Sequence, residues 1–342
     1  MSVPLTGYRI LPGIIVCCVV FVASSLAQST NPSPGDEKWR IPTTATLSGG
    51  LILGTNGLVY AATSDKQLYA WEASSGTLRW HTNFSSLHWF SGPLAVGPEG
   101  NLYVMAAPGL HALNGETGTT LWTKEAQSGC TVAIGPDGTV YTIAAYALYG
   151  TADFLYALDP ATGAVRWEWQ GSRLSGVPAL SANGMIFVVS AHGKVISIDT
   201  HTGQRIWEFV EEGVDFASVI AAGDGTVLAI GSGSEVVALE GITGERLWNF
   251  RAEGISNTLI GPGGTIYVAT YSGLIHVLDV ASGDLERELS LPFPLDYPLL
   301  LTADGALYLG NGNLYALNLA SKARSRPWSA SQPRMRDRIL FA

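Results

Sequence analysis

The chain has 342 residues, 28 of them Asp or Glu against 19 Lys or Arg, and a formal net charge of −9 at pH 7. An acidic, exported protein is a poor candidate for a nucleic-acid binder, because neutralisation of phosphates supplies most of that affinity. Cys17 and Cys18 lie in the N-terminal apolar segment, which leaves Cys130 without a partner for an intrachain disulfide. We expect Cys130 to be a small buried residue.

Residues 1–27 have the pattern of a secretory signal peptide. Arg9 supplies the positive charge, Ile14–Ala23 the short apolar core, and Ser25-Leu26-Ala27 a small-x-small cleavage site. The apolar stretch is too short for a comfortable membrane span. We therefore expect a secreted or periplasmic protein, cleaved near Ala27 and without a membrane span. Residues 28–37, rich in Pro and Ser, predict a flexible leader.

Residues 38–326 contain one unit repeated along the chain. The clearest copy is Ala157–Trp167, and related segments follow at a spacing of roughly forty residues. The other copies are Ala70–Trp80, Ala112–Trp122, Ser197–Trp207, Ala238–Trp248 and two weaker ones, Val277–Arg287 and Ala316–Arg326. A period near forty with strand-like content is typical of a β-propeller with one blade per repeat.

Within a repeat, the turn residues predict four short antiparallel strands. Asn183-Gly184 is a hairpin signal, Met185–Ser190 and Lys194–Asp199 are strand-like, and His201-Thr202-Gly203 forms the turn into an outer strand. The fold class is therefore all-β, a seven-bladed propeller of four-stranded antiparallel blades. Lys38–Pro42 is similar to an outer strand, and we expect it to complete the last blade and close the ring. An eighth blade would require strands from the tail around Trp328.

The repeat resembles the pyrroloquinoline-quinone-type propeller repeat, whose tryptophan-docking motif runs roughly A-x-D-x-x-x-G-x-x-x-W. The resemblance covers roughly residues 45–326, and Ala157, Asp159, Gly163 and Trp167 match the motif in full. Within that family it is similar to the outer-membrane assembly propeller lipoprotein and to the propeller of quinoprotein dehydrogenases. The resemblance implies structural docking roles for Trp80, Trp122, Asp159, Gly163, Trp167, Trp207 and Trp248.

Familiar catalytic signatures are absent from the sequence. It has no G-x-S-x-G, H-E-x-x-H, C-x-x-C or Walker motif, and its six histidines lack metal-ligand spacing. The resemblance raises one alternative, a dehydrogenase of alcohols or sugars that binds pyrroloquinoline quinone (PQQ) with calcium. Because those enzymes usually carry a Cys-Cys pair and residues 28–342 have none, we expect no cofactor and no metal.

The loops that lead from each outer strand to the next blade predict the binding face, because they surround the mouth of the central channel. Blade 3 adds the longest inter-strand insertion, Ala144–Asp153. The candidate residues for binding a ligand or partner are His88, Trp89, Tyr146, Tyr149, Arg173, Asp215, Asn257 and Tyr297. For each of them, packing between blades or simple solvation is the plainer interpretation.

The C-terminal segment is basic. Six of the 19 Lys and Arg residues lie at or after Lys322, and we assign residues 327–342 to a basic tail. Such a tail is either solvated or in contact with an anionic surface.

Together these observations predict an exported, non-catalytic propeller that binds a protein partner in the cell envelope. The alternatives are the quinone-dependent dehydrogenase and a carbohydrate-binding or lyase-like propeller, because a fold alone does not select a function.

Overall fold

The computed structural model describes residues 47–84, 90, 94–106, 109–125, 128–145, 153–261, 263–291, 294–295, 300–301, 306–310 and 314–318. The expected signal peptide, the leader, the closing strand at 38–42 and the basic tail at 327–342 lie outside these residues. The structural statements below concern the described residues.

The described residues form seven antiparallel sheets, six with four strands and one with three. We number them as blades 1–7 in chain order. Blades 1–3 are β1 (Leu47–Leu53), β2 (Leu58–Thr63), β3 (Gln67–Glu72), β4 (Leu78–Asn83); β5 (Ala95–Val96), β6 (Leu102–Ala106), β7 (Gly109–Leu113), β8 (Thr120–Glu125); and β9 (Ser128–Ile134), β10 (Val140–Ala145), β11 (Asp153–Leu158), β12 (Val165–Gly171).

Blades 4–7 follow the same order. They are β13 (Ser175–Leu180), β14 (Met185–Ser190), β15 (Lys194–Asp199), β16 (Arg205–Phe209); β17 (Phe216–Ala221), β18 (Thr226–Gly231), β19 (Glu235–Glu240), β20 (Arg246–Arg251); β21 (Ile255–Gly261), β22 (Thr265–Thr270), β23 (Leu274–Asp279), β24 (Leu285–Ser290); and β25 (Leu300–Leu301), β26 (Ala306–Gly310), β27 (Leu314–Asn318). A single 3₁₀ turn, η1 (Ala191–Gly193), joins β14 to β15.

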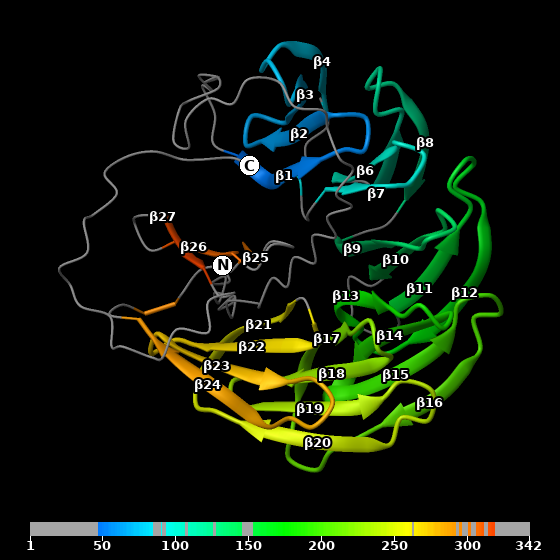
Figure 1. Ribbon diagram of the computed structural model, residues 1–342. Coiled ribbons are helices and arrows are strands. Elements are labelled where there is room, and N and C mark those ends of the chain that lie inside the picture. The colour runs from blue at the N-terminus through cyan, green and yellow to red at the C-terminus, as the bar shows by residue number, and fades with distance from the viewer. Residues whose placement is uncertain are drawn as a thin grey trace, which may run out of the picture.

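Figure 1 shows the sheets arranged around a common centre, with the first strand of a blade innermost and the fourth outermost. This confirms the predicted all-β propeller of antiparallel blades. Blade 7 lies between blade 6 and blade 1 and has three described strands. The strand expected to complete it, at residues 38–42, is outside the described part of the chain.

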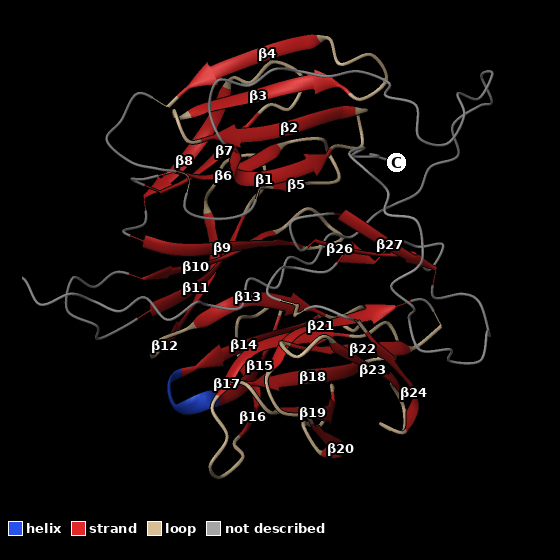
Figure 2. Ribbon diagram, turned by 90° about the vertical axis from the view of Figure 1, so that its left-hand side faces the viewer, coloured by secondary structure: helices blue, strands red, loops and turns tan. Residues whose placement is uncertain are grey.

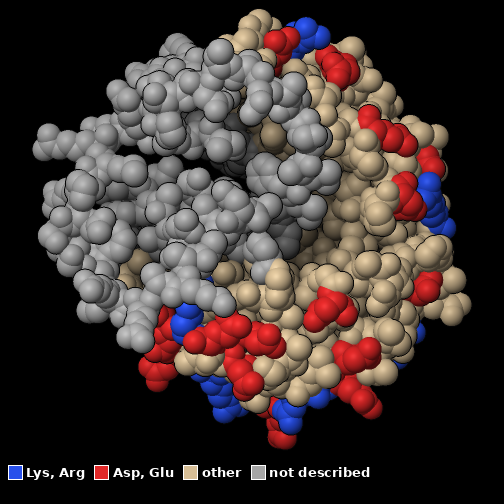
Figure 3. Space-filling view, viewed as in Figure 1, with Lys and Arg blue, Asp and Glu red and all other residues tan. Residues whose placement is uncertain are grey.

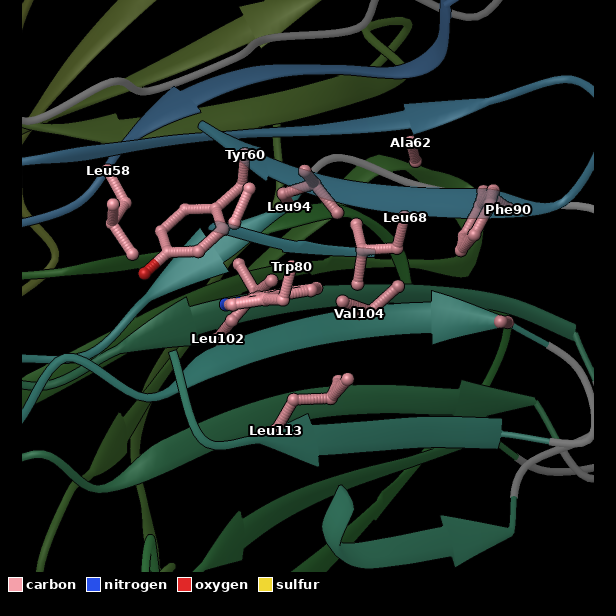
Figure 4. Close-up of a cluster of buried hydrophobic side chains, with 12 residues drawn as sticks. Leu58, Tyr60, Ala62, Leu68, Trp80, Phe90, Leu94, Leu102, Val104 and Leu113 are labelled. Carbon is pink, nitrogen blue, oxygen red and sulfur yellow. The ribbon is translucent and has the colours of Figure 1, made fainter. Parts of the chain in front are cut away.

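The hydrophobic core lies between blades. One cluster joins Tyr60 and Leu68 of blade 1 to Leu102, Val104 and Leu113 of blade 2, and all five side chains are fully buried (Figure 4). Burial of this kind follows from strands with apolar residues on both faces, because each blade is covered by a neighbour on either side. Each blade is therefore held mainly by the two blades beside it.

A tryptophan near the start of the outer strand fastens each of blades 1–5 to the next blade. The indole Nε1 donates a hydrogen bond of 2.8–2.9 Å to a backbone carbonyl in the β3–β4-type turn of the following blade. The pairs are Trp80 with Gly115, Trp122 with Pro160, Trp167 with Thr200, Trp207 with Gly241 and Trp248 with Val280. In each pair, the glycine three residues after the carbonyl residue lies against the indole ring. A Cβ added to that glycine would come within 2.7 Å of a ring carbon.

Two faces of the propeller differ in their connections. The turn face carries the turns between the first and second strands and between the third and fourth strands of each blade. Backbone hydrogen bonds join these turns, as from Thr200 N to Gly184 O at 3.0 Å. The described residues of this face lie at 54–57, 73–77, 97–101, 114–119, 135–139, 159–164, 181–184, 200–204, 222–225, 241–245, 261, 263–264 and 280–284.

The loop face carries the turns between second and third strands and the connections from one blade to the next. Its longest described connections are 172–174, 210–215 and 252–254, and η1 also lies on it. In Figure 2, η1 stands on the left, at the loop face, and β1 and β3 point towards the turn face on the right.

Candidate functional site

The loop face is the candidate site, because blade-to-blade connections converge there around the centre of the ring. Of the eight predicted binding residues, Arg173, Asp215 and Asn257 are described. His88, Trp89, Tyr146, Tyr149 and Tyr297 lie outside the described residues, so their positions remain predictions.

Asp215 lies at the junction of blades 4 and 5. Its backbone carbonyl accepts hydrogen bonds from Ser232 N at 2.8 Å and Ser232 Oγ at 3.1 Å, which tie the β16–β17 connection to the β18–β19 turn. The backbone of Gly193 in η1 packs against the same connection. A Cβ added to Gly193 would lie only 2.6 Å from the Cα of Asp215, so the position has no room for a side chain. The carboxylate of Asp215 is left exposed beside η1.

Three basic residues on the loop face have a left-handed backbone. Lys66, Arg173 and His192 have φ of 68°, 47° and 63°, and they are the non-glycine residues with positive φ in the described part of the chain. This conformation costs free energy for residues with a Cβ, and such strain gathers at functional sites. Arg173 and His192 are exposed, whereas Lys66 is half-buried.

Asn257 is withdrawn from the surface. Its side chain on β21 is only 7% exposed, and its Oδ1 atom has no hydrogen-bond partner in the described structure. It pairs with Ala269 just after an irregularity in the register of β21 with β22. The structure therefore does not bring Asn257 to the exposed surface that carries Arg173 and Asp215.

Two exposed residues of the loop face were not predicted from the sequence. Tyr271, in the β22–β23 turn, is 44% exposed, and Val210, which follows β16, is 54% exposed. The hairpin turn T-Y-S-G that contains Tyr271 has an ordinary turn sequence. Only an alignment of the repeats, which places this turn on the loop face, could have identified Tyr271 as a candidate.

An ion pair between a buried carboxylate and an exposed arginine lies beside the β18–β19 turn of the loop face. Glu235, at the start of β19, is 4% exposed and binds Arg251 Nε at 3.1 Å and Asn249 Nδ2 at 3.0 Å. Burial alone would raise the pKa of Glu235, but hydrogen bonds from Arg251 and Asn249 outweigh it and lower the pKa. The carboxylate is thus held charged in a structural role.

A cluster of metal ligands for the calcium of quinoprotein dehydrogenases is not found among the described residues. Calcium takes six to eight oxygen ligands, mostly from carboxylates and carbonyls. Among the described residues no group of three or more His, Cys, Asp or Glu side chains gathers where a metal ion would bind. Cys130, on β9, has no neighbouring cysteine in the sequence.

Comparison with known proteins gives a family and a fold. The family described as outer membrane protein assembly factor BamB matches residues 23–168 and 110–328. BamB from Moraxella catarrhalis is similar in structure, with a TM-score of 0.62 and 19% identity over 79% of this chain and 84% of that one. A europium-containing methanol dehydrogenase has a TM-score of 0.58 and 14% identity over 76% of this chain and 72% of that one.

The chain spans only a small part of the length of one curated relative. The serine/threonine-protein kinase AfsK of Streptomyces griseus is 27% identical over 166 residues, which cover 46% of this chain. The matched part spans only 20% of that protein's length. Within the described residues, no helix has the length and apolar content to cross a membrane.

Proposed function

The chain belongs to the family of the outer membrane protein assembly factor BamB, and from that membership we propose an exported, non-catalytic propeller that binds a protein partner in the cell envelope. The loop face is the proposed contact surface. The signal-peptide pattern of residues 1–27 supports export, with cleavage near Ala27.

The observation that carries this proposal is the mixture of exposed groups on the loop face. Tyr271 and Val210 offer apolar contact area, and Arg173 and Asp215 offer charged hydrogen-bonding groups. Tyr and Arg are among the residues that dominate binding energy at protein interfaces.

The two alternatives are weaker on present observations. A quinone-dependent dehydrogenase has in its favour the fold shared with the europium-containing methanol dehydrogenase, at 14% identity. A carbohydrate-binding propeller depends on aromatic residues such as Tyr146 and Tyr149, which lie outside the described residues.

The test compares variants of the full-length protein that are changed on the loop face with variants that are changed on the outer strands. We would replace Arg173 and Tyr271 by Ala, and as a matched control Arg79 and Leu247, which are also exposed but lie on outer strands. Each tagged protein is used to capture partners from its native envelope fraction, and the bound amount is measured against concentration.

We expect the loop-face variant to lose at least tenfold in affinity for a stoichiometric partner that the control variant retains. Equal binding by both variants would move the contact surface elsewhere. If wild type captures no stoichiometric protein, the proposal itself fails. Reduction of a dye with added PQQ, calcium and an alcohol would then identify the dehydrogenase alternative.

A further inference from the structure

One ion pair on blade 5 differs from the other ion pairs of the described residues. Each of these pairs includes a residue of an outer strand, and Figure 3 shows nearly all Lys and Arg at the periphery of the ring, beside Asp and Glu. In the pair of Arg251 with Glu235, 71% of the Arg251 side chain is exposed but only 5% of the Glu235 side chain. The acids of the other pairs are 25–62% exposed, and their bases are all less exposed than Arg251.

The buried carboxylate holds the exposed guanidinium at two points. Arg251 Nε lies 3.1 Å from Glu235 Oε1, and Arg251 Nη2 donates to Glu235 Oε2 at 3.2 Å. Asn249 Nδ2 donates to the same Oε1 at 3.0 Å, so the carboxylate is itself fixed. A two-point contact orders a side chain that is otherwise flexible. The exposed remainder of the guanidinium keeps N–H donors for another group.

The repeat itself does not require a carboxylate at this position. Glu235 begins the third strand of blade 5 and lies opposite Arg251, the last residue of the fourth strand. The equivalent pairs in other blades are Gln67 with Asn83, Gly109 with Glu125, Phe154 with Gln170 and Leu274 with Ser290. A buried charge is costly to desolvate, and pairing it with an exposed arginine adds little stability. A carboxylate that the fold does not need therefore points to a use at the surface.

Arg251 stands at the edge of the loop face. It ends β20 and is followed by the connection 252–254, which is joined to the β18–β19 turn by a backbone hydrogen bond of 3.0 Å. At the other end of this connection, Tyr271 N donates to Gly254 O at 2.8 Å, and a Cβ added to Gly254 would lie 3.5 Å from Tyr271 Cδ2. A fixed guanidinium and an exposed phenol ring thus border one short, hydrogen-bonded connection.

A second ion pair extends the network towards blade 4. Arg246 Nη1 contacts both carboxylate oxygens of Glu211, at 3.1 and 3.2 Å. Hydrogen bonding to Glu235, and more weakly the charge of Glu211, raise the pKa of Arg251. The Arg246 side chain is 50% exposed and that of Glu211 only 25%. The two arginines therefore form the outer layer of the network and the two glutamates the inner layer, so the network presents positive groups on a chain of net charge −9.

We propose that Arg251 binds a carboxylate in an acidic segment of the protein partner, and that Glu235 is the residue that positions its guanidinium. This inference rests on the proposed function, because it names the chemistry that the partner brings to the loop face. An acidic segment is favoured over a basic or neutral one because the arginines are the exposed groups of the network, and charged groups across an interface are arranged to be complementary.

The test uses the full-length chain and peptides selected on it from a random library displayed on phage. Each selected peptide is labelled with fluorescein, and its binding is followed by anisotropy. The variants are Arg251→Gln alone and Arg251→Gln with Glu235→Gln, which leaves no unpaired buried charge if the single variant is unstable. The controls are Arg205→Gln, at another exposed ion pair on β16, and Glu253→Gln, which removes an exposed negative charge two residues from Arg251.

We expect the selected peptides to share an Asp or Glu and to lose at least tenfold in affinity for both Arg251 variants. The Arg205 control should change affinity less than twofold, and Glu253→Gln should leave it unchanged or strengthen it. Replacing the shared acid by its amide should cost as much affinity on wild type, and nothing further on Arg251→Gln. Peptides that share no acid, or that bind the Arg251 variants as well as wild type, would overturn the proposal.

The positioning role of Glu235 has a separate readout, the NMR relaxation of the Arg251 Nε–H group. We expect an order parameter of about 0.8 in wild type and below about 0.6 in Glu235→Gln, together with at least threefold weaker peptide binding. Arg79, which contacts Glu72 through a single nitrogen at 3.2 Å, is the control and should be mobile in both proteins. An Arg251 group as mobile as that of Arg79 would remove the positioning role.

This inference and the proposed function can fail separately. If wild type captures a stoichiometric envelope partner and Arg251→Gln binds that partner equally well, the inference fails and the proposed function stands. If wild type captures no partner but selects acidic peptides that depend on Arg251, the proposed function fails and the carboxylate site stands.

Discussion

Gly203 shows how strictly a single position is constrained. Its φ is 70°, and an added Cβ would lie 2.7 Å from Cδ2 of Trp167 on the preceding blade. Gly213 has a similar φ of 77°, but nothing lies within 4 Å of its missing Cβ. The two glycines therefore separate the cost of backbone conformation from the cost of contact with the indole.

We expect Gly213→Ala to destabilise the protein by about 1–2 kcal/mol, the cost of a left-handed backbone. Gly203→Ala should cost roughly 1–3 kcal/mol more, because the methyl group must displace Trp167. Urea unfolding measures both. In a Trp167→Ala background the cost of Gly203→Ala should fall to that of Gly213→Ala, and an unchanged cost would show that the indole contact is not the cause.

His111 gives a pH dependence to the boundary of blades 1 and 2. Its ring packs edge-on against Phe84 with centroids 5.2 Å apart, Nε2 donates to Ala106 O at 2.9 Å, and Nδ1 accepts from Thr123 Oγ1 at 3.0 Å. Burial lowers the pKa of His111 below 6.5, and the hydrogen bond to Ala106 only partly opposes this. The neutral ring is therefore the form that the folded chain favours.

Because the folded pKa lies below that of an unfolded histidine, the unfolded chain binds the proton first as pH falls. The contribution of His111 to stability is present above pH 6.5 and is lost as pH falls towards the folded pKa. We expect the free energy of unfolding to decline less between pH 7 and pH 5 in His111→Gln than in wild type. His201→Gln, at an exposed turn, is the matched control and should follow the wild-type profile.

Individual site residues were predicted unevenly. Arg173 and Asp215 lie in blade-to-blade connections, as the repeat boundaries predicted, and propeller topology gathers these connections on one face. Their role in binding stays a prediction. Asn257 was assigned to the same connections, but it lies inside β21, at a distortion that the sequence does not mark.

At the scale of elements, turn chemistry fixes the strands. The predicted strands Met185–Ser190 and Lys194–Asp199 coincide with β14 and β15, because Gly residues with positive φ bound them. Register shifts in the first strands of blades 1, 3, 4, 5 and 6 were not predicted. Such bulges depend on how inner strands fit around the centre, which is a property of the closed ring and not of local sequence.

Asp159 shows how one carboxylate organises the turn between third and fourth strands. Its Oδ1 accepts hydrogen bonds from the backbone N–H of Ala161 and Thr162 and from Thr162 Oγ1, at 2.9–3.1 Å. Asn114 makes the same three contacts in blade 2. Hydrogen bonds from Arg166 and from the turn lower the pKa of Asp159.

We expect Asp159→Ala to cost about 1–2 kcal/mol, as at other side-chain caps, and Asp159→Asn to cost less because the amide oxygen still accepts. Thermal unfolding at pH 7 compares the variants. Since the pKa of Asp159 is lowered, the advantage of wild type over the Asn variant should disappear as pH falls below about 3.8. Equal losses for Asn and Ala at pH 7 would assign the effect to the ion pair with Arg166 at 2.9 Å.

At the scale of the whole molecule, the fold was the most predictable property. Several copies of one repeat each predict the same blade, so an uncertain strand or turn in one copy is corrected by the others. Closure of the ring is the part still to be tested. The predicted closing strand at 38–42 contains Trp39, in the same sequence setting as Trp80 on β4. Gly76 in blade 1, with φ of 70°, is equivalent to the glycines of blades 2–6 that contact a tryptophan of the preceding blade.

We expect Trp39→Ala to lower the unfolding temperature as much as Trp80→Ala does, because both would detach one blade from the next. Deletion of residues 28–37, which are assigned to the leader, is the control and should leave the unfolding temperature unchanged. A chain that tolerates Trp39→Ala without loss would not be closed by this strand.

The indole-to-glycine contact between blades runs in one direction, since each of blades 1–5 inserts a tryptophan into the blade that follows. An interaction of this head-to-tail kind has no natural end. If the predicted closing strand left its own ring, its Trp39 could insert instead beside Gly76 in blade 1 of another copy. We would look for chains of linked molecules in such preparations, and the same property gives evolution a simple way to add a blade by duplicating one repeat.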